Sequence, residues 1–277
     1  MIGSEVPTAG DRASPLVVVL PVHDEEATVA DVIALVPPLV HGRPVVVVVV
    51  DDGSTDASAT LAREAGAKVV AHPRCRGLGA AIRTGFEVAL ELDAWAVAFL
   101  DADGEYDPGE LAWVLAPIVR DEADYVVGSR FTGKIESMRP HRRIGNLLLT
   151  WLTSLVTGRR LTDGQSGFRA LGRAALAAAD IEHDYNYAQV LTLDLLRKGY
   201  RYSEVPIRYH RRRHGRSFVR PGRYLRHVLP AMARVLARTS GKGRRPGRVG
   251  RCGKGRRPGR AGKYGKGRRP GRAGKCR

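Results

Sequence analysis

Short apolar runs alternate with helix-like segments along the first half of the chain. The runs are rich in β-branched residues and cover 16–20, 45–50, 67–71, 94–100 and 124–128. Unbroken apolar runs of this length are typical of strands buried on both faces of a sheet. Between them, apolar residues recur every three or four positions, over 25–36, up to about Ala65 and over 77–92. The alternation predicts an α/β fold with a doubly wound, mostly parallel sheet and right-handed crossovers.

The second half of the chain is less regular. It predicts an apolar helix over 144–157, a polar turn over 163–169 that enters a short strand, a helix over 187–198 and a strand over 202–207. Residues 224–236 place apolar side chains at helical spacing with Arg and His between them. This pattern predicts a basic amphipathic helix that Pro230 kinks or restarts.

Three 12-residue repeats follow from residue 241: GKGRRPGRVGRC, GKGRRPGRAGKY and GKGRRPGRAGKC. Gly and Pro dominate them and large apolar side chains are nearly absent, so they cannot offset their ordering entropy and should be disordered. We therefore expect a flexible N-terminus over 1–14, a single α/β domain over 15–220, the amphipathic helix over 221–240 and a disordered basic tail over 241–277.

The net charge of +18 belongs to this tail. Residues 241–277 hold 16 of the 46 Lys and Arg residues and no Asp or Glu, so the other 240 residues carry 30 basic and 28 acidic side chains. The folded part is therefore close to neutral. The tail is expected to bind polyanions such as nucleic acid with strong salt dependence and without sequence specificity.

Targeting and crosslinking signals are weak. The three cysteines, Cys75, Cys252 and Cys276, form no C-x-x-C pair and favour a reducing compartment over a disulfide framework. Residues 1–14 lack the apolar stretch of a secretory signal. The apolar stretch 144–158 has about 15 residues, short of the roughly 20 that a spanning helix needs. We expect a cytoplasmic chain without a transmembrane helix.

Acidic residues follow three of the predicted strands. They lie in Pro21-Val22-His23-Asp24-Glu25, in Asp51-Asp52 and in Asp101-Ala102-Asp103. Ligands of open parallel sheets bind beyond the carboxyl ends of the strands. Several carboxylates at one edge repel one another unless a cation or hydrogen-bond donors compensate. Asp101 and Asp103 in an extended D-x-D are expected to hold Mg²⁺ or Mn²⁺ together with phosphate oxygens.

Two further motifs have competing interpretations. Asp51 and Asp52 open a helix-capping turn, but a cap needs one of them, so the second favours a hydrogen bond to a nucleobase or ribose. The glycine-rich segment 76–85 is either a phosphate cradle at a helix N-terminus or a tight turn with close helix packing. It lacks the lysine of a P-loop, and no dinucleotide fingerprint occurs at the first crossover.

Taken together, the motifs resemble family-2 glycosyltransferases, and among them the dolichyl- or polyprenyl-phosphate mannosyl and glucosyl synthases. The matching segments, in order, are PVHDEE (21–26), VDDGSTD (50–56), RGLGAAIRTG (76–85), DADGE (101–105), VGSRF (127–131), DGQSGFR (163–169), EVPIRY (204–209) and RRHGRSF (212–218). The first four are common in the family, and the later ones are closer to the polyprenyl-phosphate branch.

The resemblance implies a GT-A fold, an inverting single displacement and a metal-dependent hexosyltransferase that uses GDP-mannose or a UDP-sugar. It implies these roles: nucleotide contacts from Pro21, His23, Glu25 and Asp52, metal at Asp101, Asp103 and Glu105, an acceptor or sugar-phosphate contact from Arg130, the sugar side lined by Gln165 and Ser166, and a phosphate clamp from Arg212 and Ser217. If segment 76–85 is a phosphate cradle, Gly77 is its expected contact with the nucleotide-sugar.

Several positions depart from the family pattern. Asp24 stands where Asn is usual, His23 where Tyr is frequent, Cys75 where Asn is common and Phe218 where a lysine is familiar, and Glu105 takes the place of a frequent Gln. These departures bear on the nucleotide and the donor sugar rather than on the reaction class.

The acceptor determines what catalysis requires. A phosphate acceptor is already an anion and attacks without a general base, so positioning and charge stabilisation by Asp103, the metal and Arg212 suffice. An alcohol acceptor, on a polysaccharide or a small soluble molecule, would need a base, and Asp163 is the candidate. Helices 144–157 and 223–238 fit a lipid acceptor and peripheral binding to the anionic inner face of the cell membrane. A core helix and a solvated charged face remain the alternatives.

Overall fold

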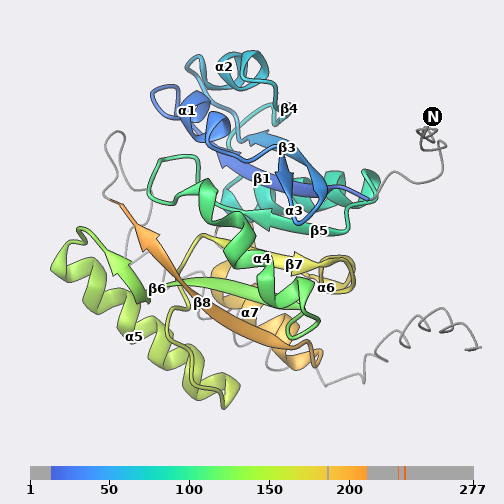
Figure 1. The fold of residues 1–277 in the computed structure, drawn as a ribbon. Helices are drawn as coiled ribbons and strands as arrows, with labels where there is room; N and C mark the ends of the chain where they lie inside the picture. Colours follow the sequence, from blue (N-terminus) through green and yellow to red (C-terminus); the bar gives the residue numbers. More distant parts are fainter. Residues whose placement is uncertain (1–13, 186, 211–229, 231–233, 235–277) are drawn as a thin grey trace, which may run out of the picture. The chain divides into compact units, whose positions relative to one another are not determined.

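Strand β1 (Leu16–Val22) lies between two parallel neighbours. It pairs with β3 (Arg43–Asp51) on one side and with β5 (Ala96–Phe99) on the other. The structure, a computed structural model, describes residues 14–185, 187–210, 230 and 234. Every residue of β1 except Pro21 is buried, as expected of a strand covered on both faces. The carboxyl ends of the three strands therefore lie side by side at one edge (Figure 1).

The remaining strands extend this sheet in the order β2-β3-β1-β5-β7-β6-β8, and β4 also pairs with β3. Their bounds are β2 Leu39–Val40, β4 Lys68–Ala71, β6 Tyr125–Ile135, β7 Arg169–Gly172 and β8 Tyr202–Tyr209. β7 runs antiparallel between β5 and β6, and β2 is antiparallel to β3. The other pairings are parallel, so the expected mostly parallel α/β sheet is confirmed.

Helices cover both faces of the sheet (Figure 1). Their bounds are α1 Val29–Ala34, α2 Ser58–Glu64, α3 Leu78–Glu91, α4 Leu111–Val119, α5 Pro140–Thr157, α6 Arg173–Ala178 and α7 Ala188–Arg197. One core cluster joins Val18 and Leu20 of β1 to residues of α1, α2 and α4. The other joins Val17 and Val19 to residues of α3, α6 and α7. Because successive side chains of β1 point to opposite faces of the sheet, β1 contributes residues to both core clusters.

Several element boundaries differ from the expected ones for local reasons. Helix α1 begins at Val29 rather than near residue 25, because the amides of Glu25 and Glu26 donate to Ser58 Oγ (2.8 Å) and Asp56 Oδ2 (3.1 Å). β6 continues to Ile135 because β8 still pairs with it there. The turn that follows Asp107, whose side chain accepts from the Gly109 amide at 2.8 Å, is the 3₁₀ segment η1 (Pro108–Glu110).

Helix α5 begins at Pro140, before the apolar stretch that predicted it. Thr150 and Thr153 on it are buried, whereas several of its large apolar side chains are exposed. It is therefore not an enclosed core helix. In the part of the chain that the structure describes, no helix combines the length and apolar character needed to cross a bilayer.

All described residues belong to one compact unit, Met1–Arg245. The expected flexible N-terminus up to residue 13, the repeats over 241–277 and nearly all of the amphipathic helix over 221–240 lie outside the described residues.

Two glycines inside helices form a matched pair for testing the packing of α3. A Cβ at Gly85 would lie 2.3 Å from Val19 Cγ1, whereas a Cβ at Gly145 in α5 would meet nothing within 4 Å. Gly85→Ala should lower the free energy of unfolding by about 1–3 kcal/mol through overpacking against β1. Gly145→Ala should raise it by up to about 1 kcal/mol, since alanine is the better helix former. Urea denaturation measures both, and equal effects would contradict the close packing.

Candidate active site at the carboxyl ends of the parallel strands

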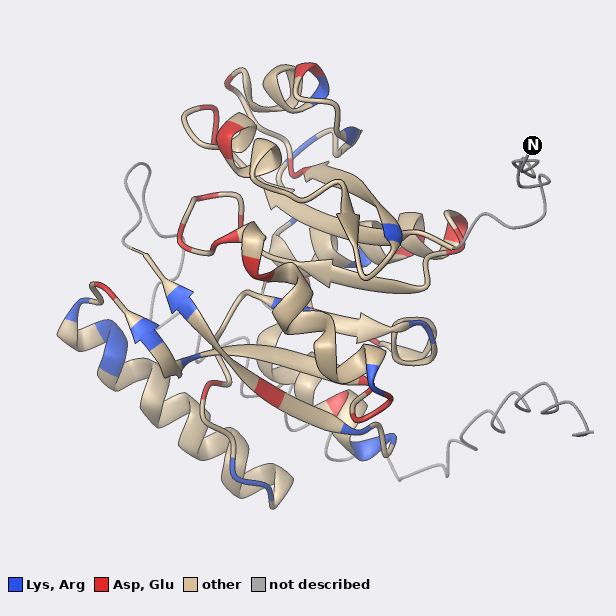
Figure 2. Ribbon diagram, in the orientation of Figure 1, with Lys and Arg blue, Asp and Glu red and all other residues tan. Residues whose placement is uncertain are grey.

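The segments that follow β1, β3 and β5 are tied to one another. The Asp52 amide donates to the Val22 carbonyl at 2.8 Å, and Thr28 Oγ1 donates to the Ala102 carbonyl at 2.7 Å. Glu25 is buried, and its amide bonds to Ser58. Figure 2 shows Asp and Glu residues, in red, in the loops at this edge. The structure therefore brings the three acidic strand ends together, as the parallel pairing predicted.

The D-x-D turn leads into a network around Glu105. Asp103 is 7 % exposed, and its Oδ1 accepts the Glu105 amide at 3.0 Å. Glu105 Oε1 lies 3.3 Å from Arg142 Nη1. Burial, the charge of Glu105 and its hydrogen bond raise the pKa of the Tyr209 hydroxyl. Glu105 thus contacts Arg142 and Tyr209, and its expected role as a metal ligand stays a prediction.

Asp101 and Asp103 remain the acidic pair of this turn. Asp101 is half-buried, and its Oδ2 lies 2.5 Å from where a Cβ of Gly167 would sit. Among the residues that the structure describes, no three or more His, Cys, Asp or Glu side chains group so as to hold a metal ion. A cation here would need other ligands beside protein carboxylates.

Asp52 is saturated by donors of the protein itself. Its Oδ1 accepts from His72 Nδ1 (2.7 Å) and the Arg76 amide (2.9 Å), and its Oδ2 accepts from the Gly77 amide (2.7 Å) and Cys75 Sγ (3.4 Å). A carboxylate offers about four such acceptor sites. Burial raises the pKa of Asp52, but these hydrogen bonds outweigh it and the pKa is lowered. Asp52 thus supports the loop over 72–77, and its expected contact with a base or ribose stays a prediction.

The glycine turn packs closely against a distant segment. Gly77 has φ +109°, and a Cβ there would lie 2.5 Å from the Asp184 carbonyl oxygen. The Gly79 amide donates to the same oxygen at 2.7 Å. A Cβ at Gly79 would lie 1.9 Å from the His183 carbonyl oxygen. The close packing of the tight turn is therefore observed. The Gly77 amide donates to Asp52, and the expected phosphate contact at Gly77 stays a prediction.

The other expected nucleotide contacts lie along the end of β1. Pro21 is half-buried within the strand, and His23 Nε2 lies 3.8 Å from Asp24 Oδ2. Asp24 has φ +54°, in the left-handed region that Asn and Asp tolerate best among non-glycine residues. Its Oδ1 accepts from the Thr55 amide at 2.8 Å. The Asp24 side chain thus links the end of β1 to the end of β3.

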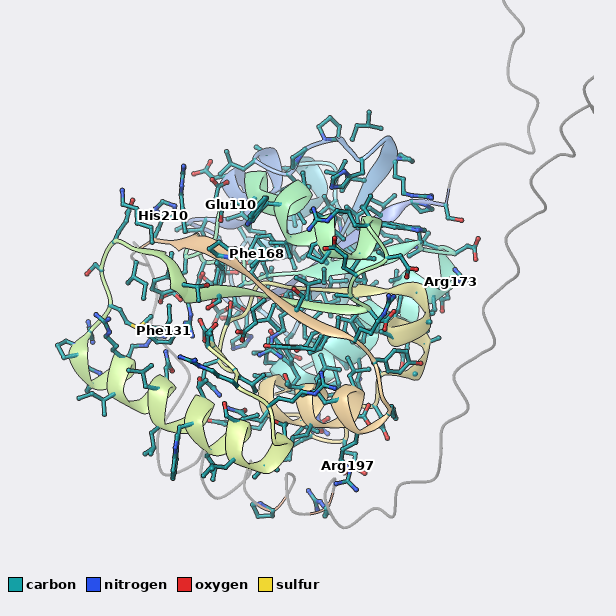
Figure 3. The ribbon with its side chains drawn as sticks, turned by 60° about the horizontal axis from the view of Figure 1, so that its bottom comes forward. Glu110, Phe131, Phe168, Arg173, Arg197 and His210 are labelled. Carbon is teal, nitrogen blue, oxygen red and sulfur yellow. The ribbon has the colours of Figure 1, made fainter. Side chains whose placement is uncertain are left out.

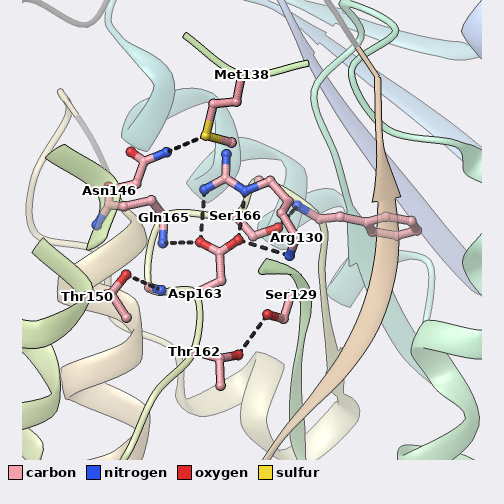
Figure 4. A network of polar contacts seen from close by, with 12 residues as sticks. Ser129, Arg130, Met138, Asn146, Thr150, Thr162, Asp163, Gln165 and Ser166 are labelled. Atoms are coloured by element: carbon pink, nitrogen blue, oxygen red, sulfur yellow. Dashed lines mark hydrogen bonds and ion pairs between the residues drawn. The ribbon is translucent and has the colours of Figure 1, made fainter. Parts of the chain in front are cut away.

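Arg130 and Asp163 form a buried, two-pronged ion pair (Figure 4). Arg130 Nε and Nη2 lie 2.7 and 2.8 Å from the two carboxylate oxygens, and the Arg130 amide donates to Oδ2 at 3.0 Å. Asp163 is 0 % exposed, and its Oδ1 also accepts the Gln165 amide at 3.1 Å. Asp163 thus holds Arg130, which also lies over the Tyr209 ring. The expected role of Asp163 as a general base for an alcohol acceptor stays a prediction.

The loop over 163–168 lies against the D-x-D turn. The Gly167 amide donates to the Tyr106 hydroxyl at 2.7 Å, and Thr150 Oγ1 of α5 accepts the Gly164 amide at 3.0 Å. Phe168, labelled in Figure 3, is fully buried beside Tyr106. Gln165 is half-buried on this loop and Ser166 is fully buried. The two expected sugar-side residues thus lie on a loop whose Gly167 packs against Asp101, and their contact with the sugar stays a prediction.

Sequence reasoning missed three residues that shape this region. His72 bridges Asp52 and Thr84, Arg142 contacts Glu105, and Arg169 donates to the carbonyls of loop 163–168 from a fully buried position. A charged residue at the start of a short buried strand was a signal for Arg169. No sequence signal pointed to His72 or Arg142, because each lies far in sequence from its partner, Asp52 or Glu105. The expected Arg212 and Ser217 lie outside the described residues.

The sequence profile of glycosyl transferase family 2 matches residues 17–180, which include the three acidic strand ends and loop 163–168. The chain belongs to glycosyl transferase family 2. This family-2 glycosyltransferase is 36 % identical over 149 residues to the UDP-N-acetylglucosamine–dolichyl-phosphate N-acetylglucosaminyltransferase of Methanococcus voltae, across 47 % of this chain and 59 % of that protein. It is 31 % identical over 197 residues to the dolichyl-phosphate hexose transferase of Haloferax volcanii, across 71 % and 83 % of the two chains.

The enzyme also shares its fold with a solved structure. This is glucosyl-3-phosphoglycerate synthase from Mycobacterium tuberculosis in complex with Mn²⁺, uridine diphosphate and phosphoglyceric acid. The TM-score is 0.65 over 81 % of this chain and 79 % of that one, with 23 % sequence identity. At this identity the likeness shows the fold alone, and the expected GT-A architecture is confirmed.

The lowered pKa of Asp52 predicts that the free energy of unfolding depends on pH. Its folded-state pKa is lowered, so its stabilising contribution is present above the pKa of the unfolded chain, about 3.9, and is lost as the pH falls through the folded value. Urea denaturation between about pH 6 and pH 3 should show a shallower loss of unfolding free energy for Asp52→Asn than for wild type. Glu64→Gln, at an exposed side chain on α2, should keep the wild-type slope. Parallel curves for Asp52→Asn and wild type would contradict the saturated carboxylate.

Asp163→Asn should destabilise the enzyme by about 3 kcal/mol, because it leaves the buried Arg130 guanidinium without its counter-ion. Thermal and urea unfolding measure the loss. The double variant Arg130→Met/Asp163→Leu should be less destabilised than the two single losses combined, since it removes both buried charges. Wild-type stability with lost turnover in Asp163→Asn would instead identify Asp163 as a base.

Proposed function

We propose that this enzyme is a hexosyltransferase that moves a sugar from a nucleotide-sugar onto a polyprenyl or dolichyl phosphate at a membrane surface, with inversion. The names of the Methanococcus and Haloferax relatives support a lipid-phosphate acceptor. They name different sugars, so the donor sugar is not specified beyond a hexose or its N-acetylated form.

The observation that carries the proposal is the burial of Asp163 in its ion pair with Arg130. An alcohol acceptor must lose a proton, and the carboxylate expected to take it is locked away from any acceptor. A phosphate acceptor arrives as an anion and needs no such base. What it needs is positive charge and orientation beside the donor. Arg142, whose side chain is 39 % exposed beside Glu105, supplies an accessible cation.

Asp101 and Asp103 suit a divalent cation that is shared with a diphosphate. They offer only carboxylate oxygens, which Mg²⁺ and Mn²⁺ prefer, and the missing side chain of Gly167 leaves room beside Asp101 Oδ2. The solved fold relative was obtained with Mn²⁺ and uridine diphosphate. When bound, the cation would offset the charge of the departing nucleoside diphosphate.

The chain's own residues then have distinct tasks. Arg142 exchanges Glu105 for the acceptor phosphate, while Asp163 fixes Arg130 as a buried positive charge behind it. Gln165 contacts the sugar from the loop that abuts Asp101, with Ser166 supporting that loop from its buried position. Pro21, His23 and Glu25 line the nucleotide side, held by the contacts between the ends of β1 and β3. Arg212 and Ser217 remain proposed phosphate contacts.

A soluble acceptor is the second candidate, favoured by the fold likeness to glucosyl-3-phosphoglycerate synthase. The two are separated by the partition of product. With membranes and a labelled nucleotide-sugar, a lipid product enters butanol, whereas a soluble product stays in water. Binding of polyanions by the basic tail over 241–277 is compatible with either, and deletion of this tail should leave turnover in detergent intact.

Asp101→Asn and Asp103→Asn should each reduce turnover by about 100-fold or more, because each weakens the charge stabilisation of the leaving diphosphate. The assay is a panel of GDP- and UDP-sugars with polyprenyl phosphate and Mn²⁺ or Mg²⁺, and chelation should abolish the wild-type reaction. Glu122→Gln is the control, since Glu122 pairs with Arg120 just before β6, at the opposite edge of the sheet. Full activity of both Asn variants would contradict the proposal.

A further inference from the structure

Helix α5 carries a continuous exposed apolar stripe. Ile144, Leu147, Leu148, Trp151 and Leu155 are 67, 45, 61, 58 and 58 % exposed. The spacing of three and four residues places them on one side of the helix. Other exposed large apolar side chains of the described residues, such as Leu35 and Trp113, are scattered over other elements. A stripe of this kind marks an interaction surface rather than ordinary surface composition.

The opposite side of α5 is firmly attached to the enzyme. Leu149 and Val156 pack against Val190 and Leu193 of α7. Thr150 is buried and accepts the Gly164 amide. The apolar stripe therefore faces away from the core, as the outward side chains of α5 in Figure 3 illustrate.

Basic residues flank the stripe at both ends (Figure 2). Arg139, His141, Arg142 and Arg143 lie at or just before its start, and Arg159 and Arg160 follow its end, with no Asp or Glu over 137–162. Cations at a helix N-terminus oppose the helix dipole. Their presence there is unfavourable for the helix alone, so it points to an external anionic partner.

We infer that α5 docks flat on an anionic bilayer, with its stripe among the acyl chains and its flanking arginines at the phosphates. The helix does not meet the requirements for crossing a bilayer, whereas an apolar stripe with Trp and basic ends is typical of helices that lie in the interface. The stripe alone would also suit a second protein, but charge of one sign at both of its ends is complementary to a lipid surface.

This inference rests on the proposed function and adds a geometry to it. Arg142, in the first turn of α5, contacts Glu105 beside the D-x-D turn. It lies only about 3 Å along the helix axis from Ile144, the start of the stripe. A lipid phosphate held at headgroup level would therefore reach the acidic strand ends without leaving the bilayer.

The test uses the full chain and its three tryptophans, Trp95, Trp113 and Trp151. The variant Trp95→Phe/Trp113→Phe keeps Trp151 alone, and Trp95→Phe/Trp151→Phe keeps Trp113 alone. On phosphatidylcholine/phosphatidylglycerol vesicles, Trp151 emission should shift to the blue and be quenched by brominated acyl chains, whereas Trp113 should do neither. Vesicle binding without quenching of Trp151, as binding through the basic tail would give, overturns the inference.

A second pair of variants tests the stripe itself. Leu148→Gln/Trp151→Gln should bind these vesicles at least 10-fold more weakly in about 0.5 M salt, where contributions from exposed charges are screened. The matched control Leu35→Gln/Trp113→Gln should bind as wild type. Circular dichroism and melting temperature check that both fold. A wild-type dimer in light scattering that becomes monomeric in Leu148→Gln/Trp151→Gln would overturn the inference and assign the stripe to a second copy.

Turnover separates this inference from the proposed function. With polyprenyl phosphate in vesicles, Leu148→Gln/Trp151→Gln should lose most activity, and with a water-soluble short-chain prenyl phosphate it should match wild type. Equal loss with both acceptors would overturn the docking role. If wild type makes no lipid product while Trp151 is still quenched, the proposed function fails and the docking surface stands.

Discussion

The parallel pairing of β3, β1 and β5 is the constraint on which the rest of the structure depends. It forces the carboxylates that follow these strands to one edge, where they repel one another. The protein neutralises part of this set internally: Asp52 is saturated by His72 and backbone amides, and Glu105 is held by Arg142. Asp101 and Asp103 in the turn after β5 offer the carboxylate oxygens that suit an external cation. The fold thus gathers negative charge at one edge of the sheet and offsets part of it with hydrogen bonds and an ion pair inside the protein.

Two arginines that differ in burial, Arg130 and Arg142, place positive charge near these carboxylates. Arg130 is fixed by Asp163 in a dry ion pair, which costs flexibility but holds the guanidinium in one orientation. Arg142 is partly exposed and bonds only weakly to Glu105, at 3.3 Å, so it is free to change partners. An anionic acceptor needs an accessible cation and no general base, and this contrast links the packing of loop 163–168 to the proposed lipid-phosphate chemistry.

The sequence best predicted the elements that depend on the local spacing of apolar residues. The buried strands and their acidic ends followed from apolar runs and from the rule for parallel sheets. The antiparallel direction of β7 did not, because pairing partners decide it. The ion pair of Asp163 with Arg130 was not predicted either, because the two residues lie 33 positions apart in the sequence. The exposure of α5 was equally invisible, since an apolar helical pattern does not tell which side another element covers.

We propose that a cation-bridged diphosphate lies over Asp101 and Asp103. The most direct measurement is anomalous diffraction at the manganese edge from crystals grown with Mn²⁺ and a nucleoside diphosphate. We predict one strong peak within about 2–2.5 Å of a carboxylate oxygen of Asp101 or Asp103, adjoining the density of the two phosphates. A diphosphate bound at another edge of the sheet, or a manganese peak remote from both aspartates, would contradict the account.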